Sequence, residues 1–124
     1  MYRILIVDDE VDIALSLAVG LEAQGFFTKL YNDPDLALRE FNPHFYDLLL
    51  LDIRMPTMSG FELYDRIRKK DKTVKVCFLT SFDIYYRCLH EFLPDIEHHC
   101  FIRKPVSIED PSISIKRDSI IDRS

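Results

Sequence analysis

Four short stretches of the chain consist almost entirely of apolar residues, and they constrain the fold more than any other feature. They are residues 4–7, 48–51, 76–79 and 100–102, with a more mixed fifth candidate at 27–31. A strand that alternates apolar and polar residues has one face in water, whereas a continuously apolar strand is covered on both faces, as in a parallel sheet. The runs therefore predict a parallel sheet with helices on both sides.

Helix-like segments separate these runs. Residues 11–24 place apolar side chains at helical spacing and stop at Gly25, and residues 81–93 form another apolar and aromatic segment. Two further helix starts carry capping signals: Asp33 before Pro34, and Ser59 three residues before Glu62. Strand and helix alternate five times along the chain. This order predicts an α/β fold built on a doubly wound, five-stranded parallel sheet.

The end of the chain departs from this regularity. Ser107 to Asp110 has the spacing of a helix start, but Pro111 follows at once, and proline disrupts a helix beyond its first turn. We expect residues 107–124 to be irregular or to form a short final helix that is broken near Pro111.

Composition and charge exclude several classes of protein. The 124 residues include 48% apolar and 30% charged residues with a formal net charge of -5, which argues against a nucleic-acid or anionic-membrane surface. No stretch reaches the roughly 18 apolar residues of a membrane span. The cysteines are Cys77, Cys88 and Cys100. Their odd number and wide spacing favour reduced, buried thiols in a cytoplasmic protein.

Polar residues follow each apolar run at the point where the predicted strand ends. Asp8, Asp9 and Glu10 follow the first run, and Asp52 follows residues 48–51; Thr80 and Lys104 come after the later runs. Parallel strands all point the same way, so these residues gather at the carboxyl edge of the sheet, where open α/β sheets bind their ligands.

The cluster has a readable chemistry. Asp8, Asp9 and Asp52 bring three negative charges together and Lys104 returns one positive charge. A divalent cation would neutralise the remaining negative charge, and hard carboxylate oxygens suit Mg²⁺. A carboxylate flanked by a metal, an ammonium group and a hydroxyl is a reasonable acceptor for a phosphoryl group.

The segments that carry these residues resemble one family. "ILIVDDE", "LLLLDIRMPTMSG", "CFLTS" and "FIRKP", in this order and near these spacings, are similar to the receiver domain of two-component response regulators, including its single-domain, chemotaxis-type members. The resemblance covers about residues 2–106 and implies one receiver domain over residues 1–124. It also implies the flavodoxin-like strand order 2-1-3-4-5.

The resemblance assigns the phosphate and metal chemistry. Asp52 matches the phosphoacceptor, and Asp9 with Asp52 matches the direct ligands of Mg²⁺ or another divalent cation. Asp8 matches a ligand that acts largely through water, and the backbone carbonyl of Arg54 matches the third protein ligand. Lys104 matches the lysine that pairs with a phosphoryl oxygen.

The resemblance also assigns a switch. Thr80 matches the hydroxyl that moves toward the phosphoryl group, and Phe101 matches the aromatic rotamer switch, although a core residue is an equally good explanation for Phe101. The Lys104–Pro105 peptide bond matches one that is cis in the family, where proline makes the cis form accessible.

These assignments lead to an expected function. The chain would accept a phosphoryl group on Asp52 from a sensor histidine kinase or phosphotransfer protein, in the cytoplasm, without acting as an enzyme on any external substrate. It would then change a surface around the fourth helix and fifth strand that binds an unidentified downstream protein, as a monomer or a weak phosphorylation-linked dimer, with no direct contact to nucleic acid or membrane. The alternatives are a phosphate-independent interaction module of the same fold, or a receiver fragment of a longer regulator.

Two features bear on the details. A phosphatase of the haloacid-dehalogenase kind would need a second Asp two residues after the first, and Arg54 occupies that position. In receiver domains, this position and that of Phe82 line the path of the attacking water. Two bulky residues there predict slow self-dephosphorylation.

Overall fold

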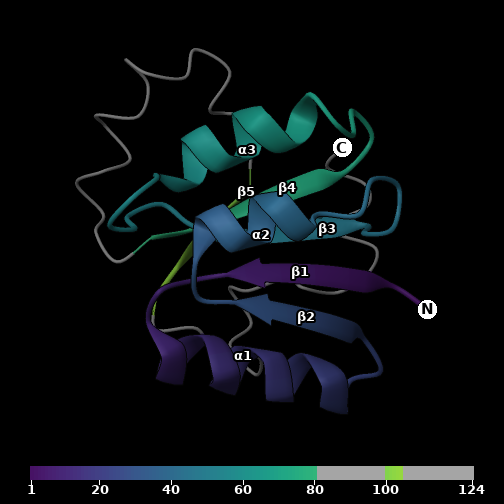
Figure 1. Cartoon of the computed structure of the whole chain (residues 1–124). Coiled ribbons are helices and arrows are strands. Elements are labelled where there is room, and N and C mark those ends of the chain that lie inside the picture. Colours follow the sequence, from purple (N-terminus) through teal and green to yellow (C-terminus); the bar gives the residue numbers. More distant parts are fainter. Residues whose placement is uncertain (81–99, 105–124) are drawn as a thin grey trace.

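The structure is a computed structural model that describes residues 1–80 and 100–104 (Figure 1). Strands and helices alternate along the first part of the chain. The strands are β1 (Arg3–Val7), β2 (Phe27–Tyr31), β3 (Leu48–Asp52), β4 (Lys75–Thr80) and β5 (Cys100–Arg103). The helices within the described residues are α1 (Val11–Ala23), α2 (Pro34–Glu40) and α3 (Gly60–Arg68). Each apolar run of the sequence is a strand, including the mixed candidate at β2.

The strands form one parallel sheet in the order β2-β1-β3-β4-β5. The order confirms the predicted doubly wound topology. In the register of the two inner strands, Val7 of β1 lies opposite Leu51 of β3. The residues that follow, Asp8 and Asp52, are therefore neighbours at the carboxyl edge although 44 positions separate them.

Alternate residues of each strand face two separate apolar cores. In β1, Leu5 and Val7 belong to the core that α2 and α3 cover, whereas Ile4 and Ile6 belong to the core under α1. Figure 1 shows this division, with α1 on one face of the sheet and α2 and α3 on the other. Because both faces are covered, every residue of β3 is buried, which explains the unbroken leucine run.

Local capping fixes where the helices begin. The Asp33 carboxylate accepts a hydrogen bond from the backbone N–H of Asp35 at 3.0 Å, and the Ser59 hydroxyl accepts one from Glu62 at 3.1 Å. Both contacts confirm the predicted caps of α2 and α3. After α1, Gly25 adopts a positive φ of 95°, the left-handed conformation that glycine reaches most easily.

The expectation of reduced thiols is wrong for two of the three cysteines. Cys77 and Cys100 lie opposite each other in the pairing of β4 with β5, with their Cα atoms 4.4 Å apart, and form a disulfide. This separation is within the range that a disulfide spans. The two cysteines are 23 positions apart, and the expected strand order makes β4 and β5 neighbours without fixing the register that places Cys77 opposite Cys100. Cys88 lies outside the described residues.

Several expectations fall on residues that the structure does not describe. These are the fourth helix over residues 81–93, the irregular end of the chain around Pro111, and the position of Phe82. Among the residues that are described, no helix is both long enough and apolar enough to span a membrane.

Candidate functional site

The predicted site residues lie at the carboxyl edge of the sheet, where backbone hydrogen bonds hold the ends of the strands together. The N–H of Ile53 donates to the carbonyl of Leu79 at 3.0 Å, and the N–H of Lys104 donates to the carbonyl of Thr80 at 2.7 Å. The N–H of Asp8 donates to the carbonyl of Tyr31 at 3.1 Å. These backbone hydrogen bonds therefore hold the strand ends, and the side chains that they carry, in fixed positions relative to one another.

The ammonium group of Lys104 lies among three carboxylates. Its Nζ atom is 3.1 Å from Oδ2 of Asp8 and 3.5 Å from Oδ1 of Asp52, and it also contacts Oε1 of Glu10. Lys104, Asp8 and Asp52 are all buried. Buried charges persist in proteins only when they are paired or bind a metal, so the ammonium and the carboxylates depend on one another.

Burial and crowding shift the protonation of these groups. Burial, followed by the charge of Asp8, raises the pKa of Asp52 to about 7, although the nearby Lys104 charge opposes the shift. Burial also raises the pKa of Asp8. Burial alone would lower the pKa of Lys104, but its hydrogen bond to Glu10 and the charges of Asp52 and Asp8 raise it overall. The site holds more negative charge than one ammonium group neutralises.

The donor set fits a divalent cation. Oxygen atoms of Asp8, Glu10 and Asp52 lie within 4.8 Å of one another. Among the residues that the structure describes, the Oδ2 atom of Asp8 is fully buried and accepts no hydrogen bond, and it lies 3.1 Å from the ammonium group of Lys104. Carboxylate oxygens in such a group are the ligands that Mg²⁺ prefers, and Glu10 is the member of the group that is exposed to water.

The other predicted residues surround this group. Asp9 is partly exposed and contributes to the raised pKa of Asp52, and Arg54 is exposed two positions after Asp52. Thr80 ends β4 and is partly buried. The Phe101 ring stacks on Phe78 with 5.5 Å between centroids, on the side of the core that α2 and α3 cover.

Three predicted details are not tested by these contacts. They are the carbonyl of Arg54 as a metal ligand, the motion of Thr80 and Phe101, and the cis peptide bond between Lys104 and Pro105. Pro105 lies outside the described residues.

Glu10 is the residue that sequence reasoning missed. It joins Asp8 and Asp52 in the group of three carboxylates and contacts Lys104, whereas the sequence had pointed to Asp9 as the third acid. The signal was present, because Glu10 belongs to the same acidic run after β1. Its direction could not be foreseen, because it depends on the turn between β1 and α1. In that turn, the N–H of Glu10 donates to Oδ1 of Asp8 at 2.9 Å.

The start of α3 packs against the backbone at the end of β3, next to Asp52. The N–H of Gly60 donates to the carbonyl of Ile53 at 2.9 Å, and a Cβ atom at this position would overlap the backbone oxygen of Asp52. Only glycine lets the helix approach the end of β3 so closely. The close approach fixes the backbone that carries Asp52.

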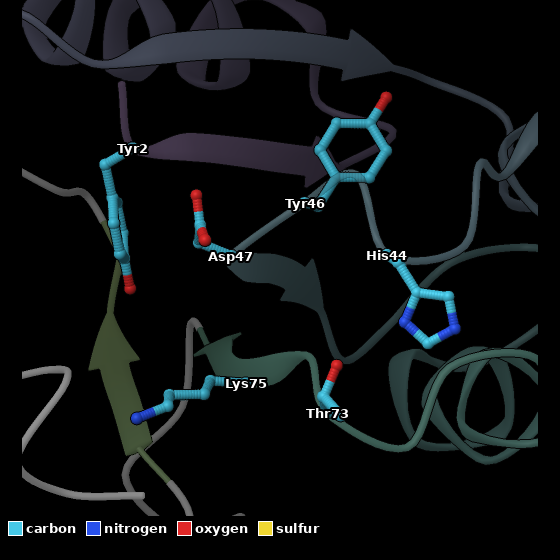
Figure 2. A pocket seen from close by; sticks show the side chains of 6 residues that line it. All are labelled: Tyr2, His44, Tyr46, Asp47, Thr73 and Lys75. Atoms are coloured by element: carbon cyan, nitrogen blue, oxygen red, sulfur yellow. The ribbon is translucent and has the colours of Figure 1, made fainter.

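A hollow of about 360 Å³ lies at the opposite, amino edge of the sheet (Figure 2). The side chains that line it are Tyr2, His44, Tyr46, Asp47, Thr73 and Lys75. Two of its polar groups already have partners within the protein, since Asp47 accepts a hydrogen bond from the N–H of Arg3 and the Thr73 hydroxyl donates to Asp71. This hollow shares no residue with the acidic site.

Comparison with known proteins decides the family. The family model described as the response regulator receiver domain matches residues 4–114. This chain belongs to the response regulator receiver domain family. The family and the fold thus agree with the resemblance that the motifs carried.

Curated relatives of this receiver domain are longer proteins. The transcriptional regulatory protein RprY of Bacteroides fragilis is 30% identical over 114 residues, which are 92% of this chain and 48% of that protein. PrrA of Mycobacterium tuberculosis is 37% identical over 79 residues, which are 64% of this chain and 34% of that protein. The receiver domain spans about half the length, or less, of these relatives.

Solved structures share the fold of this receiver domain. The response regulator TrrA of Thermotoga maritima, in complex with Mg²⁺ and BeF, is 31% identical with a TM-score of 0.74 and full coverage of both chains. In a second structure, TrrA is bound to the histidine kinase ThkA, with 29% identity, a TM-score of 0.73 and coverage of 99% and 98%.

Proposed function

We propose that this receiver domain is a phosphorylation-controlled switch whose phosphoacceptor is Asp52. One observation carries the proposal: the Asp52 carboxylate is buried at the carboxyl end of β3, 3.5 Å from the ammonium group of Lys104 and within a group of carboxylates suited to a divalent cation. A purely structural acid would gain nothing from two further carboxylates crowded beside it.

The proposed phosphoryl donor is a phosphohistidine of a sensor histidine kinase or phosphotransfer protein. Support comes from the related regulator TrrA, which has been solved both with a histidine kinase and with Mg²⁺ and BeF. In the transfer, an ionised oxygen of Asp52 forms a bond to phosphorus while the bond from phosphorus to the histidine nitrogen breaks. When Mg²⁺ is bound, it supplies positive charge that offsets the charge spreading over the phosphoryl oxygens.

The residues of the chain have separate tasks in this step. The buried end of β3 orients Asp52. The charge of Lys104 favours the ionised form of Asp52, against the burial and the Asp8 charge that raise its pKa, overall to about 7. Lys104 also offers its charge to one phosphoryl oxygen. Asp8 and Asp9 are the proposed partners of the cation, together with Asp52 and the carbonyl of Arg54.

The proposed output is a change of surface. The Thr80 hydroxyl would approach the phosphoryl group and Phe101 would change its rotamer, which biases one of two arrangements near β5. The downstream partner is a protein that reads this surface, including the fourth helix outside the described residues. We place this activity in the cytoplasm and assign the domain no external substrate, because its only proposed reaction is on its own Asp52.

The first test is direct phosphorylation. The protein is incubated with Mg²⁺ and acetyl phosphate and its intact mass is measured beside the variants Asp52→Asn and Asp47→Asn. We expect the wild type and Asp47→Asn to gain one phosphoryl group and Asp52→Asn to gain none. Asp47 is a matched control, because it lies just before β3, at the amino edge of the sheet and away from the acidic edge.

The alternative makes the opposite prediction. If a folded wild-type protein takes up neither phosphate nor beryllofluoride, the domain is a phosphate-independent interaction module and the proposal is wrong. Phosphorylation that persists in Asp52→Asn would also contradict it, because the acceptor would then be another residue.

A further inference from the structure

Glu10 occupies an unusual position at the start of α1. It is the N-cap residue of this helix, yet its side chain makes no capping hydrogen bond and instead contacts the ammonium group of Lys104. N-cap side chains normally accept a hydrogen bond from the first turn of the helix. The Glu10 carboxylate is directed toward the acidic site instead.

The carboxylates around Lys104 differ in their access to water. The side chain of Glu10 is 51% exposed, whereas those of Asp8 and Asp52 are 0% and 5% exposed. A half-exposed carboxylate regains hydration when it gives up its partner, and a buried one does not. Glu10 is therefore the contact of Lys104 that is released at the lowest cost.

Lys104 is nearer to Glu10 than to Asp52. The closest contact of its Nζ atom is with Oε1 of Glu10, while Oδ1 of Asp52 lies 3.5 Å away. A phosphoryl group on Asp52 carries more negative charge than the free carboxylate and would attract the ammonium group more strongly. The ammonium group starts closer to Glu10 than to Asp52, so a move toward a phosphoryl group on Asp52 would lengthen its contact with Glu10.

We propose that Glu10 is a positioning residue that holds Lys104 in the unphosphorylated domain and competes for it with the phosphoryl group of Asp52. Glu10 would thus make the phosphorylated state less favourable relative to the unphosphorylated one. The release of Lys104 from Glu10 would be part of activation. The inference rests on the proposed function, since it concerns the same site.

The test measures binding of beryllofluoride, a phosphoryl mimic, by calorimetry at saturating Mg²⁺. We expect Glu10→Gln to bind about three- to fivefold more tightly than the wild type, the size of one partly exposed ion pair. Glu10→Asp keeps the charge, but an aspartate at an N-cap accepts a helix N–H and withdraws from Lys104. We therefore expect Glu10→Asp to bind more tightly as well. A merely structural role for Glu10 would not raise the affinity.

Two controls separate position from charge. Asp12→Asn removes the same charge from the first turn of α1, and we expect its affinity for beryllofluoride to stay near that of the wild type. Titration with Mg²⁺ alone reports on a direct role in metal binding, and we expect Glu10→Gln and Asp12→Asn to bind Mg²⁺ equally. High salt should reduce the gain in Glu10→Gln, because a half-exposed pair is screened.

Each other outcome overturns the inference. Equal or weaker beryllofluoride binding by Glu10→Gln would show that Glu10 does not compete for Lys104. Weaker Mg²⁺ binding by Glu10→Gln than by Asp12→Asn would make Glu10 a metal ligand instead. Wild-type affinity in Glu10→Asp would mean that charge alone matters. If the wild type itself bound no beryllofluoride, the proposed function would fail first, and the inference with it.

Discussion

At the scale of single residues, the raised pKa of Asp52 has a consequence for stability. The pKa is about 7 in the folded chain, against about 3.9 for an aspartate in an unfolded chain. Between these values the folded protein keeps a proton that the unfolded protein releases. The contribution of Asp52 to the free energy of unfolding is therefore greatest below about pH 4 and is lost as the pH rises through 7.

Replacement of Asp52 by asparagine removes this pH dependence. In a metal-free buffer at pH 8 we expect Asp52→Asn to be more stable than the wild type by on the order of 4 kcal/mol, and the difference to shrink toward pH 4. Urea unfolding at several pH values measures both quantities. Parallel stability curves for the two proteins would show that Asp52 titrates as an ordinary aspartate.

At the scale of elements, one buried acid connects two loops. Asp71 follows α3 and accepts hydrogen bonds from the N–H and hydroxyl of Thr73 at 2.9 and 2.7 Å, and from the N–H of His44 at 2.8 Å. His44, in the loop between α2 and β3, has a positive φ of 65°. Asp71 therefore ties this strained loop to the connection between α3 and β4.

The loss of Asp71 should cost stability. Asp71→Ala leaves two backbone N–H groups without their acceptor, and we expect the free energy of unfolding to fall by about 2–3 kcal/mol. Burial would raise the pKa of Asp71, but the hydrogen bonds of Thr73 and the N–H of His44 lower it. Its contribution is therefore present above about pH 4 and is lost as the pH falls below that value.

Denaturant unfolding measures this effect, with Asp65→Ala as the control. Asp65 is exposed, and its 3.7 Å ion pair with Lys69 is of a kind that contributes under about 0.5 kcal/mol. Similar losses in Asp71→Ala and Asp65→Ala would contradict the bridging role.

At the scale of the whole molecule, cation binding and folding should be linked. A ligand that binds only the folded state stabilises it by about 2.7 kcal/mol when its concentration is 100 times its dissociation constant. We expect Mg²⁺ to raise the melting temperature of the wild type and to have a smaller effect on Asp9→Asn, with both proteins similar in EDTA. Thermal unfolding with and without Mg²⁺ measures this, and Asp47→Asn should respond like the wild type. An equal response in Asp9→Asn would exclude Asp9 as a ligand.

Sequence reasoning succeeded where one local pattern decides the outcome. The continuous apolar runs predicted the strands, and polar residues after each run predicted that Asp8, Asp52, Thr80 and Lys104 share one edge. Parallel strands make this inference strong, because their direction alone fixes which ends meet.

Sequence reasoning failed where the direction of a side chain or the register between two strands decides the contact. The disulfide between Cys77 and Cys100 depends on the register of β4 with β5, and the contact of Glu10 with Lys104 depends on one turn. Asp71 follows a run of basic residues, and its hydrogen-bond partner His44 is 27 positions away, so no local pattern marks it as a bridge between loops. None of these leaves a periodic signal in the sequence.

The long separation between Lys104 and its carboxylate partners affects how the site is made. The ribosome adds Asp8, Glu10 and Asp52 in the first half of the chain, whereas Lys104 arrives 94 positions after Glu10. Until β5 joins the sheet, the acidic edge lacks its ammonium group and carries uncompensated charge. Docking of β5 is therefore a step of folding, and it is also the step that supplies the ammonium group of Lys104 on which the buried carboxylates depend.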